Sequence, residues 1–137
     1  MFKEQAKDLG LEGKVRFLGP IDNARIPRFL QRASIAVFPF KVAVSGDQEG
    51  LGLTVIEAMG CECVVVASSL SALVDTVIDG QTGFLVPPDD VSALADKLAA
   101  LLAGSSLKNI IGKRSRLFAL SKFDWPRIGL DYSQILE

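Results

Sequence analysis

Two carboxylates, Glu49 and Glu57, stand on either side of a short glycine-containing turn. An ionised carboxylate accepts hydrogen bonds through two oxygens, which matches the paired hydroxyl donors of a vicinal diol. A sugar nucleotide carries such diols on both sides of its diphosphate, so one carboxylate can take the ribose and the other the sugar. The spacing leaves a second interpretation open, in which Glu49 is an acidic residue near a helix start and Glu57 faces solvent.

Glycines between these carboxylates predict an anion site. The segment Gly50-Leu-Gly-Leu-Thr54 follows a buried strand and a polar loop, and a helix is expected to open at about Gly52. A helix start presents unpaired backbone N–H groups and the positive end of the helix dipole. Because Gly50 and Gly52 carry no side chains, a phosphate can approach this backbone closely. Glu57 then lies about five residues into the helix, roughly 7.5 Å along its axis.

The elements that position this segment alternate between strands and helices. Short apolar runs predict strands at 15–18, 35–38, 63–67 and 83–86. Helical spacing predicts helices before the second, third and fourth strands, the last of these over 70–78. Further helices are expected after Asp90, from about 107 to 120 and from about 125 to 136. This alternation predicts an α/β fold with a Rossmann-like, doubly wound parallel sheet, in which ligands bind at the carboxyl ends of the strands.

Composition removes several classes of protein. The 137 residues include 15 Lys+Arg, 16 Asp+Glu and no histidine, with a formal net charge of -1. The missing histidine excludes Ser-His-Asp and Cys-His catalysis and histidine-ligated zinc. The chain as a whole therefore lacks the excess of positive charge that is typical of nucleic-acid-binding proteins.

The two cysteines and the apolar runs bear on the cellular compartment. Cys61 and Cys63 are expected to be small buried side chains, and two sulfurs fall short of a tetrahedral zinc site. The longest apolar run, 98–103, is far shorter than the roughly 20 residues of a membrane span. We therefore expect a soluble, cytoplasmic chain, with association to a membrane left open through a longer protein of which it is a part.

Several motifs in register resemble glycosyltransferase family 4, the group 1 transferases with a GT-B fold that use sugar nucleotides. Beside the Glu-x7-Glu segment they are Val15–Gly19, Ile26–Pro39, Val64–Ser68 and Asp79–Val86. The resemblance covers nearly the whole chain. It implies that residues 1–137 form an incomplete C-terminal, donor-binding domain of a GT-B fold, with the acceptor-binding N-terminal half missing.

The resemblance also implies roles for individual residues. Glu49 would be the catalytic residue and contact the donor sugar hydroxyls, the amides from Gly50 to Thr54 would hold the distal phosphate, and Glu57 would bind the ribose diol. The implied donor-binding set is Glu49, Gly50, Leu51, Gly52, Leu53, Thr54 and Glu57. The implied reaction transfers a sugar from a nucleotide diphosphate sugar to an acceptor with retention of configuration, without a metal or a cofactor.

The chain also departs from the family pattern. The family's Gly-Gly-x-x-Glu is replaced by Ser71-Ala-Leu-Val-Asp75, and two family strands that precede 15–18 are missing. An exposed apolar strand edge is an association hazard. We therefore expect that 15–18 pairs with 35–38, or that another copy of the chain covers the exposed edge as a homo-oligomer.

The same sequence leaves one alternative to the transferase open and argues against two others. A non-catalytic sugar-nucleotide-binding module, or an inactive fragment, fits the same residues. A phosphoreceiver domain needs an acidic cluster at the strand ends, which the sequence does not provide. A dinucleotide oxidoreductase needs Gly-x-Gly-x-x-Gly directly after a strand, and Gly50-x-Gly52 has no third glycine at that offset.

Overall fold

The fold is a small parallel sheet with helices packed on both of its faces. It is taken from a computed structural model, which describes residues 1–42, 46 and 52–135. The strands are β1 (Ile35–Phe38), β2 (Val64–Ser68) and β3 (Phe84–Val86), in the order β1-β2-β3. Both pairings are parallel, with Ile35 opposite Val64 and Val66 opposite Phe84. The predicted α/β class with a parallel sheet is confirmed.

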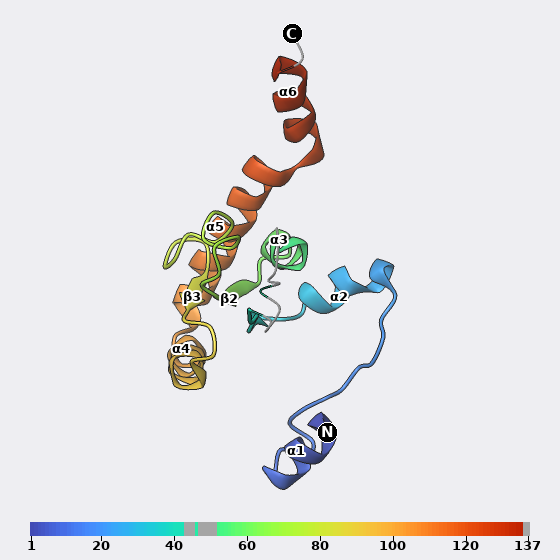
Figure 1. Cartoon of the computed structure of the whole chain (residues 1–137), viewed down its shortest axis with the longest axis vertical. Coiled ribbons are helices and arrows are strands. Elements are labelled where there is room, and N and C mark those ends of the chain that lie inside the picture. Colours follow the sequence, from blue (N-terminus) through green and yellow to red (C-terminus); the bar gives the residue numbers. More distant parts are fainter. Residues whose placement is uncertain (43–45, 47–51, 136–137) are drawn as a thin grey trace.

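The helices follow the expected alternation over most of the chain (Figure 1). They are α1 (Phe2–Asp8), α2 (Ile26–Leu30), α3 (Leu53–Gly60), α4 (Val91–Ala103), α5 (Ser105–Phe123) and α6 (Trp125–Ile135), with a short 3-10 helix η1 (Asn23–Arg25) before α2. The predicted cap of α4 is present, since Asp90 Oδ1 accepts a hydrogen bond from the Ala93 amide at 2.8 Å. Side-chain capping of this kind fixes where a helix begins.

The core lies on both faces of β2, whose five residues are all buried. Successive side chains of a strand point to opposite faces. Val65 and Ala67 accordingly pack on one side with Val55 and Met59 of α3. Val64 and Val66 pack on the other side with Leu101 of α4 and Ile111 of α5. This double coverage explains why β2 is an uninterrupted apolar run.

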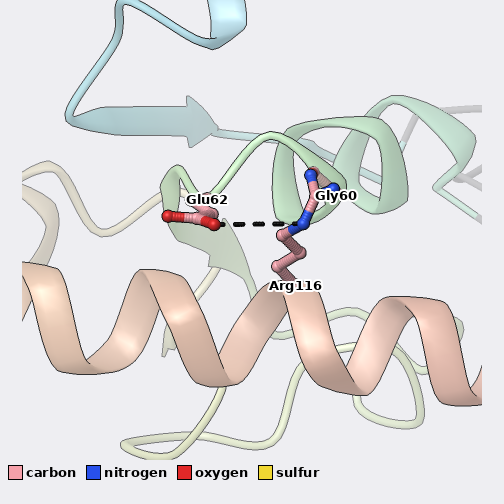
Figure 2. A network of polar contacts seen from close by, with 3 residues as sticks. All are labelled: Gly60, Glu62 and Arg116. Atoms are coloured by element: carbon pink, nitrogen blue, oxygen red, sulfur yellow. Dashed lines mark hydrogen bonds and ion pairs between the residues drawn. The ribbon is translucent and has the colours of Figure 1, made fainter.

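Helix α5 holds the turn that follows α3 (Figure 2). The Arg116 guanidinium donates a hydrogen bond to the Gly60 carbonyl oxygen, and its Nε lies 3.9 Å from Glu62 Oε1. Gly112 lies one turn earlier, where a Cβ atom would stand 2.3 Å from the Glu62 carbonyl oxygen. The backbone of α5 therefore touches the backbone of this turn, and only glycine fits at position 112.

The predicted strand at 15–18 is wrong. These residues belong to no strand, and β1 pairs only with β2 among the described residues. Val15, Phe17 and Leu18 are all exposed. A strand needs a neighbour for its backbone N–H and C=O groups, and apolar composition alone does not supply one. The expected pairing of 15–18 with β1 is therefore also wrong, while association through a second copy stays a prediction.

The predicted helix over 70–78 is wrong as well. Residues 71–76 form a series of turns, in which the Thr76 hydroxyl lies 3.5 Å from the Ala72 carbonyl oxygen. Leu73 and Val77 are buried as the apolar spacing requires, but Val74 is half exposed. Four of the five residues from 74 to 78 are β-branched. Branching at Cβ lowers helix propensity, which favours turns here.

The two cysteines are free thiols, and they differ in burial. Cys63 is buried and donates a hydrogen bond from Sγ to the Leu30 carbonyl oxygen at 3.0 Å. Burial, with a smaller effect of Cys61, raises the pKa of Cys63 to about 11. Cys61 is only partly buried, and although burial also raises its pKa, Arg116 acts in the opposite direction.

These environments predict unequal thiol reactivity. The thiolate is the reactive form, so at about pH 8 Cys61 should react with an aromatic disulfide reagent and Cys63 should not. We expect one fast equivalent in the folded chain, a second only after denaturation, and loss of the fast phase in Cys61→Ser. Because the pKa of Cys61 is raised, the rate of its reaction should increase as the pH rises above about 8. A fast phase that survives in Cys61→Ser would contradict the assignment.

Candidate functional site

The start of α3 lies at the carboxyl end of the sheet. Strands β1 and β2 are parallel, so the chain between them must return past the sheet, and α3 makes this return. Its N-terminus therefore lies on the side where β1 ends at Phe38. In open α/β sheets this is the side on which ligands bind.

Gly52 forms the N-cap of α3 in a left-handed conformation, with φ 68° and ψ 47°. Its carbonyl oxygen accepts the Val55 amide at 2.8 Å and the Ile56 amide at 3.1 Å. The amides of Leu53 and Thr54 precede the first helical hydrogen bond, so helix geometry leaves them without a carbonyl partner inside α3. The helix thus begins at Gly52, as the sequence predicts, and its first amides are backbone donors without a partner inside α3.

The side chain of Leu73 closes over Gly52. A Cβ atom at position 52 would stand 2.5 Å from Leu73 Cδ2. We therefore expect Gly52→Ala to destabilise the chain by about 2 kcal/mol, from left-handed strain and from displacement of a buried leucine. Denaturant unfolding measures this change, and Gly80→Ala is the control. Gly80 shares the positive φ but meets no atom within 4 Å. Equal losses in both variants would show that packing against Leu73 contributes nothing.

Glu57 lines a pocket between α2 and α3. The pocket has a volume of about 510 Å³, within the range of roughly 300–1,000 Å³ for small-molecule sites. Its lining residues are Asn23, Ile26, Pro27, Leu30, Leu53, Thr54, Glu57, Gly60 and Cys61. We call it the α2–α3 pocket. Glu57 is exposed, and it makes no hydrogen bond or ion pair with the part of the chain that the structure describes. None of the described residues therefore occupies this carboxylate, which is exposed at the pocket.

A second, smaller hollow of about 120 Å³ lies where the three strands end. Pro39, Ser68 and Pro87 follow or end the three strands there, and Lys41 and Asp89 lie beside them. Lys41 Nζ lies 2.5 Å from Asp89 Oδ1, and both side chains are largely exposed. Lys41 thus has a carboxylate partner across the strand ends, so its charge is already offset.

The structure brings together part of the predicted donor-binding set. Leu53, Thr54 and Glu57 line one pocket, and Gly52 caps the helix that carries them. The predictions for Glu49, Gly50 and Leu51 lie outside the described residues. Asn23 and Pro27 were missed, because they reach the pocket from η1 and α2, some thirty residues before Glu57 in the sequence. Within the described residues there is neither a metal-binding cluster nor a helix long and apolar enough to cross a membrane.

This arrangement defines a class of protein. A parallel sheet covered by helices on both faces, with a carboxylate-bearing pocket beside the helix after β1, is the architecture of a Rossmann-like α/β domain. The chain belongs to the group 1 glycosyl transferases, because that family's model matches residues 1–118. The resemblance inferred from the sequence motifs is therefore confirmed.

Individual relatives agree with this assignment. The chain is 31% identical over 135 residues to a GDP-mannose-dependent alpha-(1-6)-phosphatidylinositol monomannoside mannosyltransferase of Mycolicibacterium smegmatis, covering 98% of this chain and 35% of that protein.

Solved structures of GT-B transferases have the same fold. Sucrose-phosphate synthase from Thermosynechococcus elongatus superimposes with a TM-score of 0.85 at 32% identity, covering 98% of this chain and 32% of that one. HepE from Anabaena, in complex with UDP-glucose, superimposes with a TM-score of 0.84 at 26% identity, covering 98% and 35%. The chain thus spans about a third of the length of these relatives.

Proposed function

We propose that this chain is the donor-binding part of a retaining glycosyltransferase that takes a sugar from a nucleotide diphosphate sugar. Glu57 in the α2–α3 pocket carries the proposal. An exposed carboxylate without a partner in the described residues has both oxygens available for the two hydroxyls of a ribose. Two relatives support a sugar nucleotide as ligand, since the mycobacterial enzyme is named for GDP-mannose and HepE was solved with UDP-glucose.

The lining of the α2–α3 pocket suits a nucleoside whose base lies on the apolar walls and whose ribose lies at Glu57. Leu53 is 64% exposed at its mouth, and Ile26, Pro27 and Leu30 form the opposite wall. These apolar surfaces suit a flat base, while Glu57 suits the ribose. The diphosphate would then reach the backbone donors at the start of α3, where the helix dipole stabilises the negative charge of the leaving diphosphate. No metal or cofactor is part of this proposal.

Transfer itself requires more than this pocket. We propose that Glu49 contacts the sugar hydroxyls and acts as the catalytic residue, and that an N-terminal acceptor-binding half completes the transferase. Glu49→Ala should weaken discrimination among sugar nucleotides and leave binding of the free nucleoside diphosphate unchanged. Calorimetric titration with both kinds of ligand measures the difference. Equal losses for both would contradict a role at the sugar.

Calorimetric titration of the chain with UDP, GDP, ADP and their sugar conjugates tests donor binding. We expect one nucleotide class to bind. Cys61 supplies a second readout because it lines the same pocket. The bound nucleotide should slow the reaction of Cys61 with a thiol reagent. Binding without protection would place the nucleotide elsewhere, and no binding by any of these ligands would contradict the proposal. Binding without transfer, when an acceptor is supplied, would favour a non-catalytic sugar-nucleotide-binding module.

A further inference from the structure

The face of α2 turned away from the α2–α3 pocket carries a second pocket, lined by arginines. Its volume is about 320 Å³, and its lining residues are Arg16, Arg25, Arg28, Phe29 and Arg32. We call it the arginine pocket. The helix itself separates the two pockets, because Ile26, Pro27 and Leu30 line one of them and Arg28 and Phe29 line the other. A ligand in the arginine pocket therefore does not occupy the proposed donor site.

Positive charge is concentrated in this part of the chain. Residues 14–34 contain five basic residues and one acidic residue, although the whole chain has a formal net charge of -1. The four arginines of the pocket are exposed. None of them has a hydrogen bond or ion pair with the residues that the structure describes, whereas Lys41 and Arg116 each have a carboxylate within 4.0 Å. The charge of the arginine pocket is thus not neutralised within the described chain.

The chemistry of these side chains points to phosphate. A guanidinium is planar and always charged, and it donates paired hydrogen bonds that match a phosphate group. Four such groups around one hollow suit an anion that accepts from more than one of them. Phe29 is 38% exposed in the same pocket, and Val15 and Phe17 are exposed nearby in the sequence. The surface therefore combines phosphate-binding cations with apolar contact area.

We propose that the arginine pocket binds a phosphate-bearing ligand, separately from the nucleotide of the donor site. The same chemistry is found in a free phosphorylated compound and in the phosphate of an anionic lipid headgroup. The pocket supplies guanidinium donors to the phosphate oxygens and an aromatic side chain to the apolar part of the ligand.

Two probes separate these sources. Inorganic pyrophosphate, titrated calorimetrically, represents the soluble ligand. Vesicles of phosphatidylcholine with and without phosphatidylglycerol, used in co-sedimentation, represent the lipid. We expect binding in at least one arm, with the vesicle arm requiring the anionic lipid. Binding only to pyrophosphate supports a soluble ligand, and binding only to anionic vesicles supports a lipid. Binding in neither arm overturns the proposal.

Variants assign this binding to the pocket. The double substitution Arg28→Glu with Arg32→Glu should weaken binding by about tenfold or more, given the contribution of each cation near an anionic surface. Arg114→Glu with Lys122→Glu is the matched control, because it makes the same change in net charge at exposed positions of α5. The control should retain binding within about twofold, since distant exposed charges are screened. Equal losses of binding in the two variants would show that binding depends only on net charge and would overturn the proposal.

A conservative variant tests the geometry of the contact. Arg28→Lys with Arg32→Lys keeps the charge but removes the paired donors of the guanidinium. We expect binding of pyrophosphate to fall less than in the glutamate variant but measurably below the unchanged chain. Binding unaffected by lysine would contradict recognition by guanidinium geometry. All the substituted side chains are exposed, and circular dichroism of each variant checks that the fold is retained.

Discussion

Replacing Glu57 with alanine is expected to weaken binding of the nucleoside diphosphate by about 10- to 100-fold, the loss typical of hydrogen bonds to a charged group. The carboxylate is exposed in the α2–α3 pocket and makes no other hydrogen bond or ion pair in the described chain, so its removal leaves the fold intact. Calorimetric titration measures the loss, and the midpoint of unfolding should remain unchanged.

The control for this prediction is Asp96→Ala. Asp96 is an exposed acidic residue on α4, so its replacement changes the net charge by the same amount away from the pocket. Nucleotide binding should be unaffected by this substitution. A similar gain or loss in both variants would show that Glu57 acts through the overall charge and not through contact with the ribose.

Replacing Gly112 with alanine is expected to destabilise the chain by about 2 kcal/mol or more. The new Cβ atom would stand 2.3 Å from the Glu62 carbonyl oxygen, so α5 or the turn after α3 must move. Overpacking costs about 1–3 kcal/mol and occasionally more, and a backbone obstacle places Gly112→Ala at or above the upper end of this range. The higher helix propensity of alanine offsets about 1 kcal/mol of that cost, which leaves about 2 kcal/mol or more. The obstacle here is backbone, which cannot rotate away as a flexible side chain would. Denaturant unfolding measures the difference in stability.

Gly129 provides the matched control because it is also a helical glycine, in α6, and a Cβ atom added there would meet no atom within 4 Å. Gly129→Ala should therefore stabilise the chain by up to about 1 kcal/mol through helix propensity alone. Opposite signs for the two substitutions would confirm the close contact between α5 and the turn. A stabilising Gly112→Ala would contradict it.

The sequence correctly predicted helices and strands whose limits depend on residues close to them in the chain. Strand β1 has the expected bounds because a short apolar run before a proline specifies its length. The start of α4 was predictable from Asp90, whose carboxylate caps the helix as expected. The strand expected at 15–18 failed because a strand also depends on a neighbour that is distant in the sequence.

The candidate site likewise has a part that the sequence predicts and a part that depends on tertiary packing. The helix start at Gly52 was predictable from glycine placement, which is a feature of one short segment. Carboxylate spacing in the same segment made Glu57 a candidate, and its role stays a prediction. The opposite wall of the pocket, with Asn23 and Pro27, comes from η1 and α2 and is set by how the helices pack. The requirement for glycine at position 112 could not be predicted either, since its close contact with Glu62 joins distant parts of the sequence.

We propose above that the Glu57 carboxylate binds the ribose diol of a sugar nucleotide. The most direct test compares the affinity of the chain for UDP, GDP and ADP with that for their 2′-deoxy counterparts, in the unchanged chain and in Glu57→Gln. We predict that the unchanged chain prefers the ribonucleotide of the class it binds, and that this preference is largely lost in Glu57→Gln. An equal preference in both proteins would show that Glu57 does not contact the ribose and would contradict the proposed donor site.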